Sequence, residues 1–153
     1  MIDGAPSQEP LWRASVRVVR AVQSNVADAY GDEDGLLESA RRILTLVEGA
    51  EYRPADYATA CREAKRLVRR AQSLAVSTRP ATRAQAFVVR ATQESAILAQ
   101  QYHQGVTLDY GGHVVKLQNA AASALWHLTE GGPQSGATVH DAIRALWQGD
   151  VRP

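Results

Sequence analysis

The sequence contains a single cysteine, Cys61, which excludes an intrachain disulfide. Its 153 residues are enough for one core, because a folded chain of about that length hides roughly 70% of the surface that the unfolded chain exposes. A domain of this size needs no disulfide to stay folded. A lone thiol is most simply interpreted as the mark of a reducing compartment, so we expect a cytoplasmic protein.

Long apolar runs are missing as well. No stretch reaches the roughly 18 apolar residues that a membrane-spanning helix needs, so we expect no membrane partner. Residues 1–9 are polar and lack the basic and then apolar segments of a secretory signal. We therefore expect a disordered lead-in over residues 1–9, followed by one domain over residues 10–150.

Phenylalanine and methionine occur once each, although the apolar fraction, 45%, is ordinary. Abundant alanine accounts for much of this apolar fraction. Because alanine loses no side-chain entropy on entering a helix, a chain rich in alanine favours helix. The valine pairs at 18–19 and 88–89 are short and lie inside better helical patterns, so we predict no strand.

Apolar residues recur every three or four positions along most of the chain, which is the spacing of amphipathic helices. Glycines and prolines divide this pattern, because proline fits the first turn of a helix and glycine fits its end. The predicted helices are residues 10–31, 32–49, 54–76, 80–105, 109–130 and 138–149. The short connections between them favour antiparallel neighbours. The sequence therefore predicts an all-α, single-domain bundle of about six mainly antiparallel helices.

The four histidines, His103, His113, His127 and His140, do not have the spacing of metal ligands. His113 and His127 fall on about the same helical face, but they are separated by about 21 Å along the helix axis. That distance is too large for one ion to bridge. We predict no metal site and no cofactor.

Motifs of catalysis are not present either. No glycine-rich phosphate loop occurs, and residues 132–136 have the wrong spacing for a nucleophile elbow. Cys61 falls on the apolar stripe of the third predicted helix, where we expect a small buried side chain and not a nucleophile. These observations favour a protein that is not an enzyme.

Positive charge is concentrated in the middle of the chain, although the net charge of the whole is only +1. Residues 1–50 carry five arginines against eight acidic residues, and residues 101–153 carry three basic against four acidic residues. Residues 51–100 carry nine basic against four acidic residues, and eight of the nine are arginine. Arginine suits phosphate and carboxylate, because its planar fork donates two parallel hydrogen bonds.

Most of this charge lies on one face of the third predicted helix and at the start of the fourth. At about 100° per residue, the cations and the apolar stripe of the third helix occupy separate arcs. The predicted binding face consists of Arg62, Lys65, Arg66, Arg69, Arg70, Arg79 and Arg83.

Three interpretations of this basic face are open. It is a solvated helix face, paired with acidic residues at 32–34 and with Glu38. It binds the phosphates of DNA or RNA with the salt dependence of counterion release, although the whole protein is nearly neutral and the face has no aromatic residue to stack on bases. It docks an acidic protein, including the acidic part of a second copy of this chain.

Trp126 lies off the apolar stripe of the fifth predicted helix, which predicts partial exposure. Aromatic side chains outside a core often anchor interfaces, so Trp126 is a candidate interface residue. The alternative is that it packs beneath the sixth predicted helix.

The sequence does not identify a function, but it narrows the class. We predict a non-catalytic helical binding or assembly module that self-associates or docks an acidic protein partner. The alternative is a nucleic-acid-binding protein that uses the arginine-rich helix face over residues 62–83.

Overall fold

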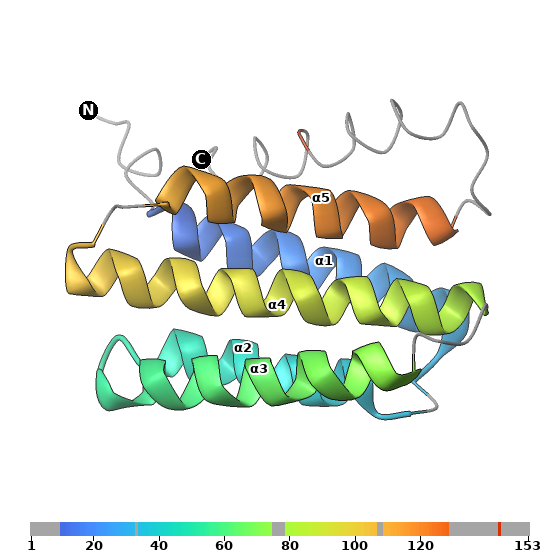
Figure 1. Cartoon of the computed structure of the whole chain (residues 1–153), viewed down its shortest axis with the longest axis horizontal. Helices are drawn as coiled ribbons and strands as arrows, with labels where there is room; N and C mark the ends of the chain where they lie inside the picture. Colours follow the sequence, from blue (N-terminus) through green and yellow to red (C-terminus); the bar gives the residue numbers. More distant parts are fainter. Residues whose placement is uncertain (1–9, 33, 75–78, 107–108, 129–143, 145–153) are drawn as a thin grey trace.

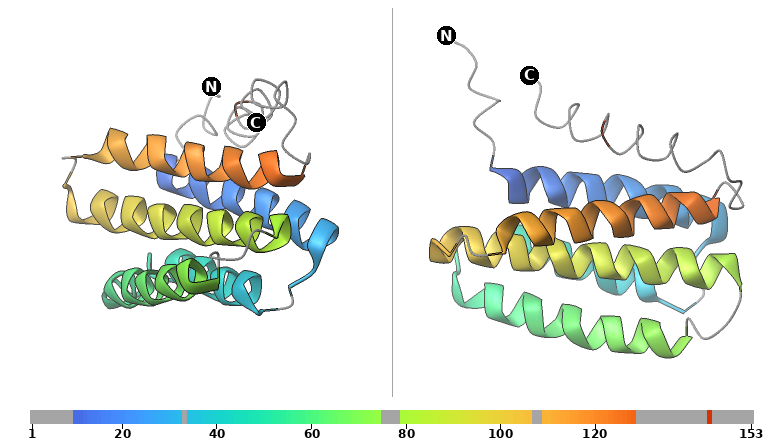
Figure 2. Two further views of the ribbon diagram at one scale, coloured as in Figure 1. Left: turned by 45° about the vertical axis from the view of Figure 1, so that its right-hand side comes forward. Right: turned by 45° about the horizontal axis from the view of Figure 1, so that its top comes forward.

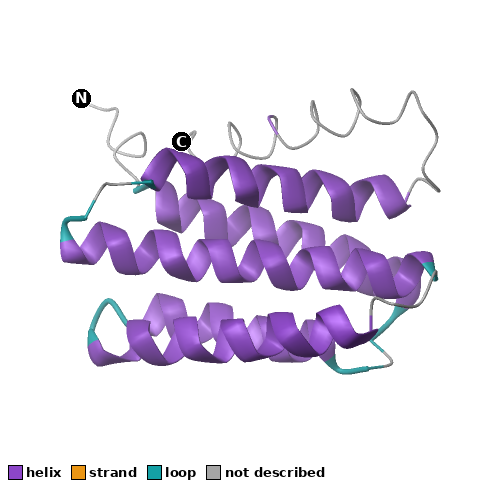
Figure 3. Cartoon of the chain, in the orientation of Figure 1, coloured by secondary structure: helices purple, strands orange, loops and turns teal. Residues whose placement is uncertain are grey.

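The described part of the chain folds into five helices and contains no strand (Figures 1 and 3). The computed structural model describes residues 10–32, 34–74, 79–106, 109–128 and 144. The helices are α1 (Leu11–Tyr30), α2 (Leu36–Gly49), α3 (Ala55–Leu74), α4 (Pro80–Gln104) and α5 (Tyr110–Leu128). The all-α prediction is confirmed.

Two predicted segments fall outside this description. The lead-in over residues 1–9 and the sixth helix over residues 138–149, apart from residue 144, lie outside the described residues. Within the described ranges, no helix has both the length and the apolar character that crossing a bilayer requires.

Glycine and proline set the helix boundaries close to the predicted positions. Gly31 and Gly105 follow α1 and α4 with φ of 72°, in the left-handed region that glycine enters without strain. Pro54 precedes α3, and Pro80 is the first residue of α4, where its missing N–H costs no helical hydrogen bond.

The start of α2 differs from the prediction. The acidic run predicts a helix start at residue 32, but α2 begins at Leu36, after Gly35 in the left-handed region. The Asp32 carboxylate accepts hydrogen bonds from the backbone N–H groups of Leu37 and Glu38, each at 2.9 Å. It thus satisfies two donors that the first turn leaves without partners, and it faces the positive end of the helix dipole.

α4 lies at the centre of the bundle and contacts each of the other four helices. Around it, α3 contacts α2, α2 contacts α1, and α1 contacts α5. α3 and α5 do not contact each other, so the ring of described helices around α4 is open at one position. In Figure 1 this open side faces the viewer, with α5 above α4 and α3 below it; Figure 2 shows the same order from two other directions.

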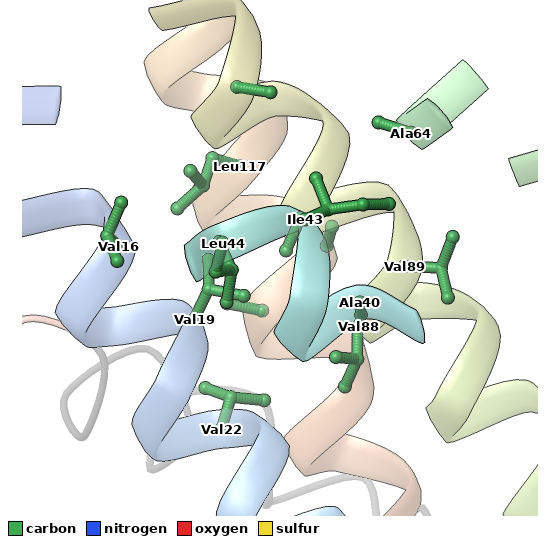
Figure 4. Close-up of a cluster of buried hydrophobic side chains, with 14 of the residues drawn as sticks. Val16, Val19, Val22, Ala40, Ile43, Leu44, Ala64, Val88, Val89 and Leu117 are labelled. Atoms are coloured by element: carbon green, nitrogen blue, oxygen red, sulfur yellow. The ribbon is translucent and has the colours of Figure 1, made fainter. Parts of the chain in front are cut away.

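Small aliphatic side chains fill the interior. Apart from Trp12, the largest fully buried side chains among the described residues are leucines and valines, and buried alanines occur on all five helices. Figure 4 shows part of this core, with labelled side chains from every helix. Each fully buried leucine or valine contributes about 1.5–3 kcal/mol relative to an exposed one, so these residues supply the apolar burial that phenylalanine provides in other cores.

Several polar side chains are buried with the apolar ones and are hydrogen-bonded there. The hydroxyl oxygens of Ser15 in α1 and Ser95 in α4 lie 2.7 Å apart. Gln23 of α1 donates to the backbone carbonyl of Leu37 in α2, at 2.6 Å. Because a buried polar group without a partner is costly, these bonds fix the register of α1 against its neighbours.

Candidate functional site

The open position around α4 is a groove. Its floor is the outward face of α4, and its walls are α3 and α5. Two hollows of about 370 Å³ and about 290 Å³ lie along it, and both are lined by Val68, Gln72, Phe87 and Arg90. Because they share these residues, the hollows form one continuous groove, which we call the α4 groove.

The α4 groove has an apolar half and a polar half. The apolar half is lined by Ala71 of α3 and by Ala86 and Phe87 of α4, with Arg83 and His127 beside them. The polar half is lined by the hydrogen-bonding residues Gln93, Glu94, Lys116, Asn119 and Ser123. A ligand along the whole groove therefore contacts both carbon surface and polar groups.

Two rings of the apolar half stack on each other. Phe87 lies against His127 with ring centroids 5.7 Å apart and planes inclined by 17°. Burial lowers the pKa of His127, and the nearby Arg83 guanidinium lowers it further. A histidine with a lowered pKa is neutral at pH 7, so His127 adds aromatic surface to the groove without adding charge.

A hydrogen-bonded pair joins α4 to α5 beside the polar half. His113 Nδ1 lies 2.5 Å from Glu94 Oε1, and both side chains are largely buried. Glu94 is the one acidic residue among the described residues that line the groove. Three cations, Arg83, Arg90 and Lys116, line the same groove, so positive charge is in excess there.

Five basic side chains of the described residues form neither a hydrogen bond nor an ion pair. They are Lys65, Arg69, Arg83, Arg90 and Lys116. Three of them, Arg83, Arg90 and Lys116, line the α4 groove directly. All five are exposed, so each keeps its donors available to a ligand.

The other two of these cations stand on the α3 wall. Helical spacing places Lys65 on the same side of α3 as Val68 and Gln72, which line the groove. Arg69 lies one turn before Gln72 and is a neighbour of Lys65 on the helix surface. The α3 wall therefore adds positive charge along the edge of the groove.

The remaining arginines of the predicted face on α3 are engaged within the protein. Arg62 and Arg66 bond to side chains one turn earlier on α3, at 3.3 Å and 2.8 Å. Arg70 donates to the backbone carbonyl of Asp34. Arg66 and Arg70 also line a separate hollow of about 270 Å³ between α2 and α3, together with Arg42. The basic residues of α3 thus divide between two sides of the helix.

Two of the acidic residues considered as partners of the basic face, Asp32 and Glu38, have other roles. The Asp32 carboxylate caps α2, and Glu38 pairs with Arg41 at 2.6 Å and with Arg42 at 3.5 Å on its own helix. These arginines lower the pKa of Glu38. Residue 33 lies outside the described ranges.

Two further predicted residues lie toward the end of the groove that contains Arg83. Arg79 is exposed and stands immediately before α4. Trp126 is 37% exposed, as predicted, and meets the ring of His127 edge-on at 5.1 Å. Both side chains make further contacts, so we do not count them among the free groups of the groove.

Two cations of the α4 groove, Arg90 and Lys116, are missing from the predicted face. They lie on α4 and α5, and nothing in the sequence shows that these two helices and α3 line one groove. One signal was present: Arg83, Phe87 and Arg90 are spaced by four and then three residues, which places them on one face of a helix.

Burial keeps the thiol of Cys61 protonated at neutral pH. It is partly buried, with Sγ 3.4 Å from Gln100 Oε1, and burial raises its pKa to about 11. A protonated thiol reacts slowly. Within the described ranges, no three or more His, Cys, Asp or Glu side chains are grouped so that they could hold a metal ion.

Comparison of the chain with protein-family models, with curated proteins and with solved structures gives no match.

Proposed function

We propose that this protein is a non-catalytic docking module whose α4 groove receives an acidic segment of a protein partner. The supporting observation is that the five cations without an internal bond all lie in or beside this groove. An exposed arginine or lysine without a partner offers all its donors to an incoming carboxylate. Most of the other basic residues have already used donors within the protein.

The apolar half of the groove supports a protein segment in particular. Charge speeds encounter and orients a ligand, but apolar contact supplies more of the affinity. A segment of acidic residues with one or two apolar side chains satisfies both halves, because its apolar groups cover Phe87 and Val68 while its carboxylates meet the cations.

The nucleic-acid alternative has weaker support. Arg62, Arg66 and Arg70, which we predicted as phosphate donors, are each bonded within the protein. The aromatic rings beside Arg83 are half-buried and stack on each other, which covers one face of each ring and leaves less surface for bases to stack on.

Fluorescence anisotropy with a labelled glutamate-rich peptide tests the proposal. A groove variant carries Arg83→Gln, Arg90→Gln and Lys116→Gln. A control variant carries Arg41→Gln, Arg42→Gln and Arg62→Gln, which are exposed positions outside the groove. Both lose three charges, so long-range attraction falls equally. We expect at least about tenfold weaker binding by the groove variant and less than about threefold by the control.

Three results would change the conclusion. Equal losses in both variants would show that net charge alone attracts the peptide, which contradicts docking in the groove. Salt-sensitive gel shifts of DNA or RNA, with no peptide binding, would establish the nucleic-acid alternative in its place. Light scattering that shows a dimer lost in the groove variant would identify the acidic segment as part of a second copy.

A further inference from the structure

The α4 groove lies between two helices that both pack on a third. Packed helices lie with their axes about 8–10 Å apart, so a groove between two helices that both pack on a third accepts one more helix at the same spacing. α3 and α5 are such a pair, because both contact α4 and neither contacts the other. From Arg83 to Glu94 the floor extends about 17 Å along α4, which is about three helical turns.

The walls of the groove favour a helical occupant over an extended one. The floor and both walls are helices, whose backbone groups are hydrogen-bonded internally, so the groove offers no strand edge. An extended segment would leave its own backbone N–H and C=O groups without partners over the apolar half. A helix satisfies these groups itself.

Three residues of the floor set the side-chain pattern of the occupant. Arg83, Phe87 and Arg90 occupy positions i, i+4 and i+7 of α4, and the two arginines are about 10 Å apart along the axis. A helix that lies alongside α4 has the same rise per residue. Acidic residues seven positions apart therefore face the two arginines, and an apolar residue between them faces Phe87.

The opposite wall adds to this pattern. Lys116 of α5 lines the same hollow as Arg90, so cations from two helices outnumber the one carboxylate there, that of Glu94. Val68 of α3 and Ala86 of α4 line the hollow that contains Phe87 and extend its apolar surface. The groove thus has positive charge on both sides of the apolar surface around Phe87: Arg83 at one end, and Arg90 with Lys116 at the other.

Building on the proposed function, we propose that the α4 groove binds an acidic amphipathic helix of a partner protein. This helix is about three turns long, carries carboxylates two turns apart and places an apolar side chain between them.

Peptides of equal charge separate helix recognition from simple attraction. The first peptide, about 15 residues long, places glutamate and leucine at the spacing given above, and the second has the same composition in scrambled order. We expect the patterned peptide to bind at least about tenfold more tightly than the scrambled one. Its helical circular dichroism signal should increase on binding, because the groove orders it.

A bulky side chain placed in the groove tests whether the peptide binds there. Ser123→Trp adds a large neutral side chain to the polar half, and Ser24→Trp makes the same change at an exposed position of α1, which does not line the groove. The melting temperatures of both variants report whether the fold is kept. We expect at least about tenfold weaker binding by Ser123→Trp and unchanged binding by Ser24→Trp.

A charge exchange gives a second test that does not depend on packing. Arg90 is exposed and has no bond within the described part of the chain, so we expect Arg90→Glu to keep the fold, which its melting temperature reports. We expect this variant to lose the patterned peptide and to regain it when the facing glutamate is replaced by lysine.

The outcomes distinguish the two proposals. Equal affinity of the patterned and scrambled peptides would overturn the helical occupant and leave the docking function in place. Unchanged binding by Ser123→Trp with its fold kept, or no recovery with the lysine peptide, would place the peptide outside the groove. Failure of every acidic peptide to bind would remove both proposals.

Discussion

The ring of His127 stacks on the ring of Phe87, the only phenylalanine of the chain, with centroids 5.7 Å apart. This contact joins α5 to α4 at the apolar half of the α4 groove. Burial first, and the Arg83 guanidinium second, lower the pKa of His127 below its usual 6.5. The folded protein therefore favours the neutral imidazole more than the unfolded chain does.

The free energy of unfolding should fall as the pH drops through about 6.5, because the unfolded state, with its ordinary histidine pKa, takes up the proton first. The loss should be complete below the lowered pKa of the folded state and absent above about pH 7.5. Urea unfolding at pH 5.5 and 7.5 measures the drop. This drop in the free energy of unfolding should be smaller in His127→Gln. It should be unchanged in the control variant His103→Gln, which replaces an exposed histidine. If the drop in the free energy of unfolding is unchanged in His127→Gln, titration of other groups causes it.

The helices could be predicted from the sequence because their signals are local. Glycines interrupt the apolar repeat at the ends of α1 (Gly31) and α4 (Gly105). Prolines interrupt it at the starts of α3 (Pro54) and α4 (Pro80). The start of α2 was placed too early, since Asp32 acts as a cap from outside the helix and not as its first turn.

The candidate site could be predicted only in part, because it depends on which helices are neighbours. Arg83 was on the predicted face. Arg90 and Lys116 were not, because they line the same groove only when α5 packs beside α4. The pairing of Glu94 with His113 is equally invisible in sequence, where spacing reveals contacts within one helix and not between two.

The buried pair of Ser15 and Ser95 should show energetic coupling. Ser15 donates to the backbone carbonyl of Trp12 at 2.5 Å, which leaves its oxygen to accept from Ser95. Ser15→Ala therefore leaves a buried hydroxyl without its acceptor and should cost about 1–3 kcal/mol. Adding Ser95→Ala should cost nothing further, because it removes that hydroxyl.

Urea unfolding of the wild type, the two single variants and the double variant measures this coupling. Ser24→Ala, at an exposed position of α1, is the control and should change the free energy of unfolding by less than about 0.5 kcal/mol. Additive losses from Ser15→Ala and Ser95→Ala would show that the two hydroxyls do not interact.

Cys61 should react slowly with thiol reagents in the native state. Burial raises its pKa to about 11 from an ordinary 9.0, so the thiolate fraction near pH 8 is about 100-fold smaller than for an exposed thiol. The rate of reaction with a disulfide reagent should rise at least about 100-fold in denaturant, and in the native state it should keep increasing up to pH 10. A native rate equal to the denatured rate would show that the thiol is exposed.

Asp32 should stabilise α2 more than its neighbour Asp34 does. Its carboxylate accepts hydrogen bonds from two backbone N–H groups of the first turn, at 2.9 Å each, whereas Asp34 interacts through its backbone carbonyl. Asp32→Ala should lower the free energy of unfolding by about 1–2 kcal/mol, since both donors lose their partner and the helix dipole loses a facing charge. Asp32→Asn should lose less, because its amide oxygen still accepts one bond. Asp34→Ala is the matched control, two positions along the same turn with the same loss of charge, and should cost less than about 0.5 kcal/mol. Equal losses from Asp32→Ala and Asp34→Ala would mean that the turn responds to charge alone and that the two hydrogen bonds contribute no stability of their own.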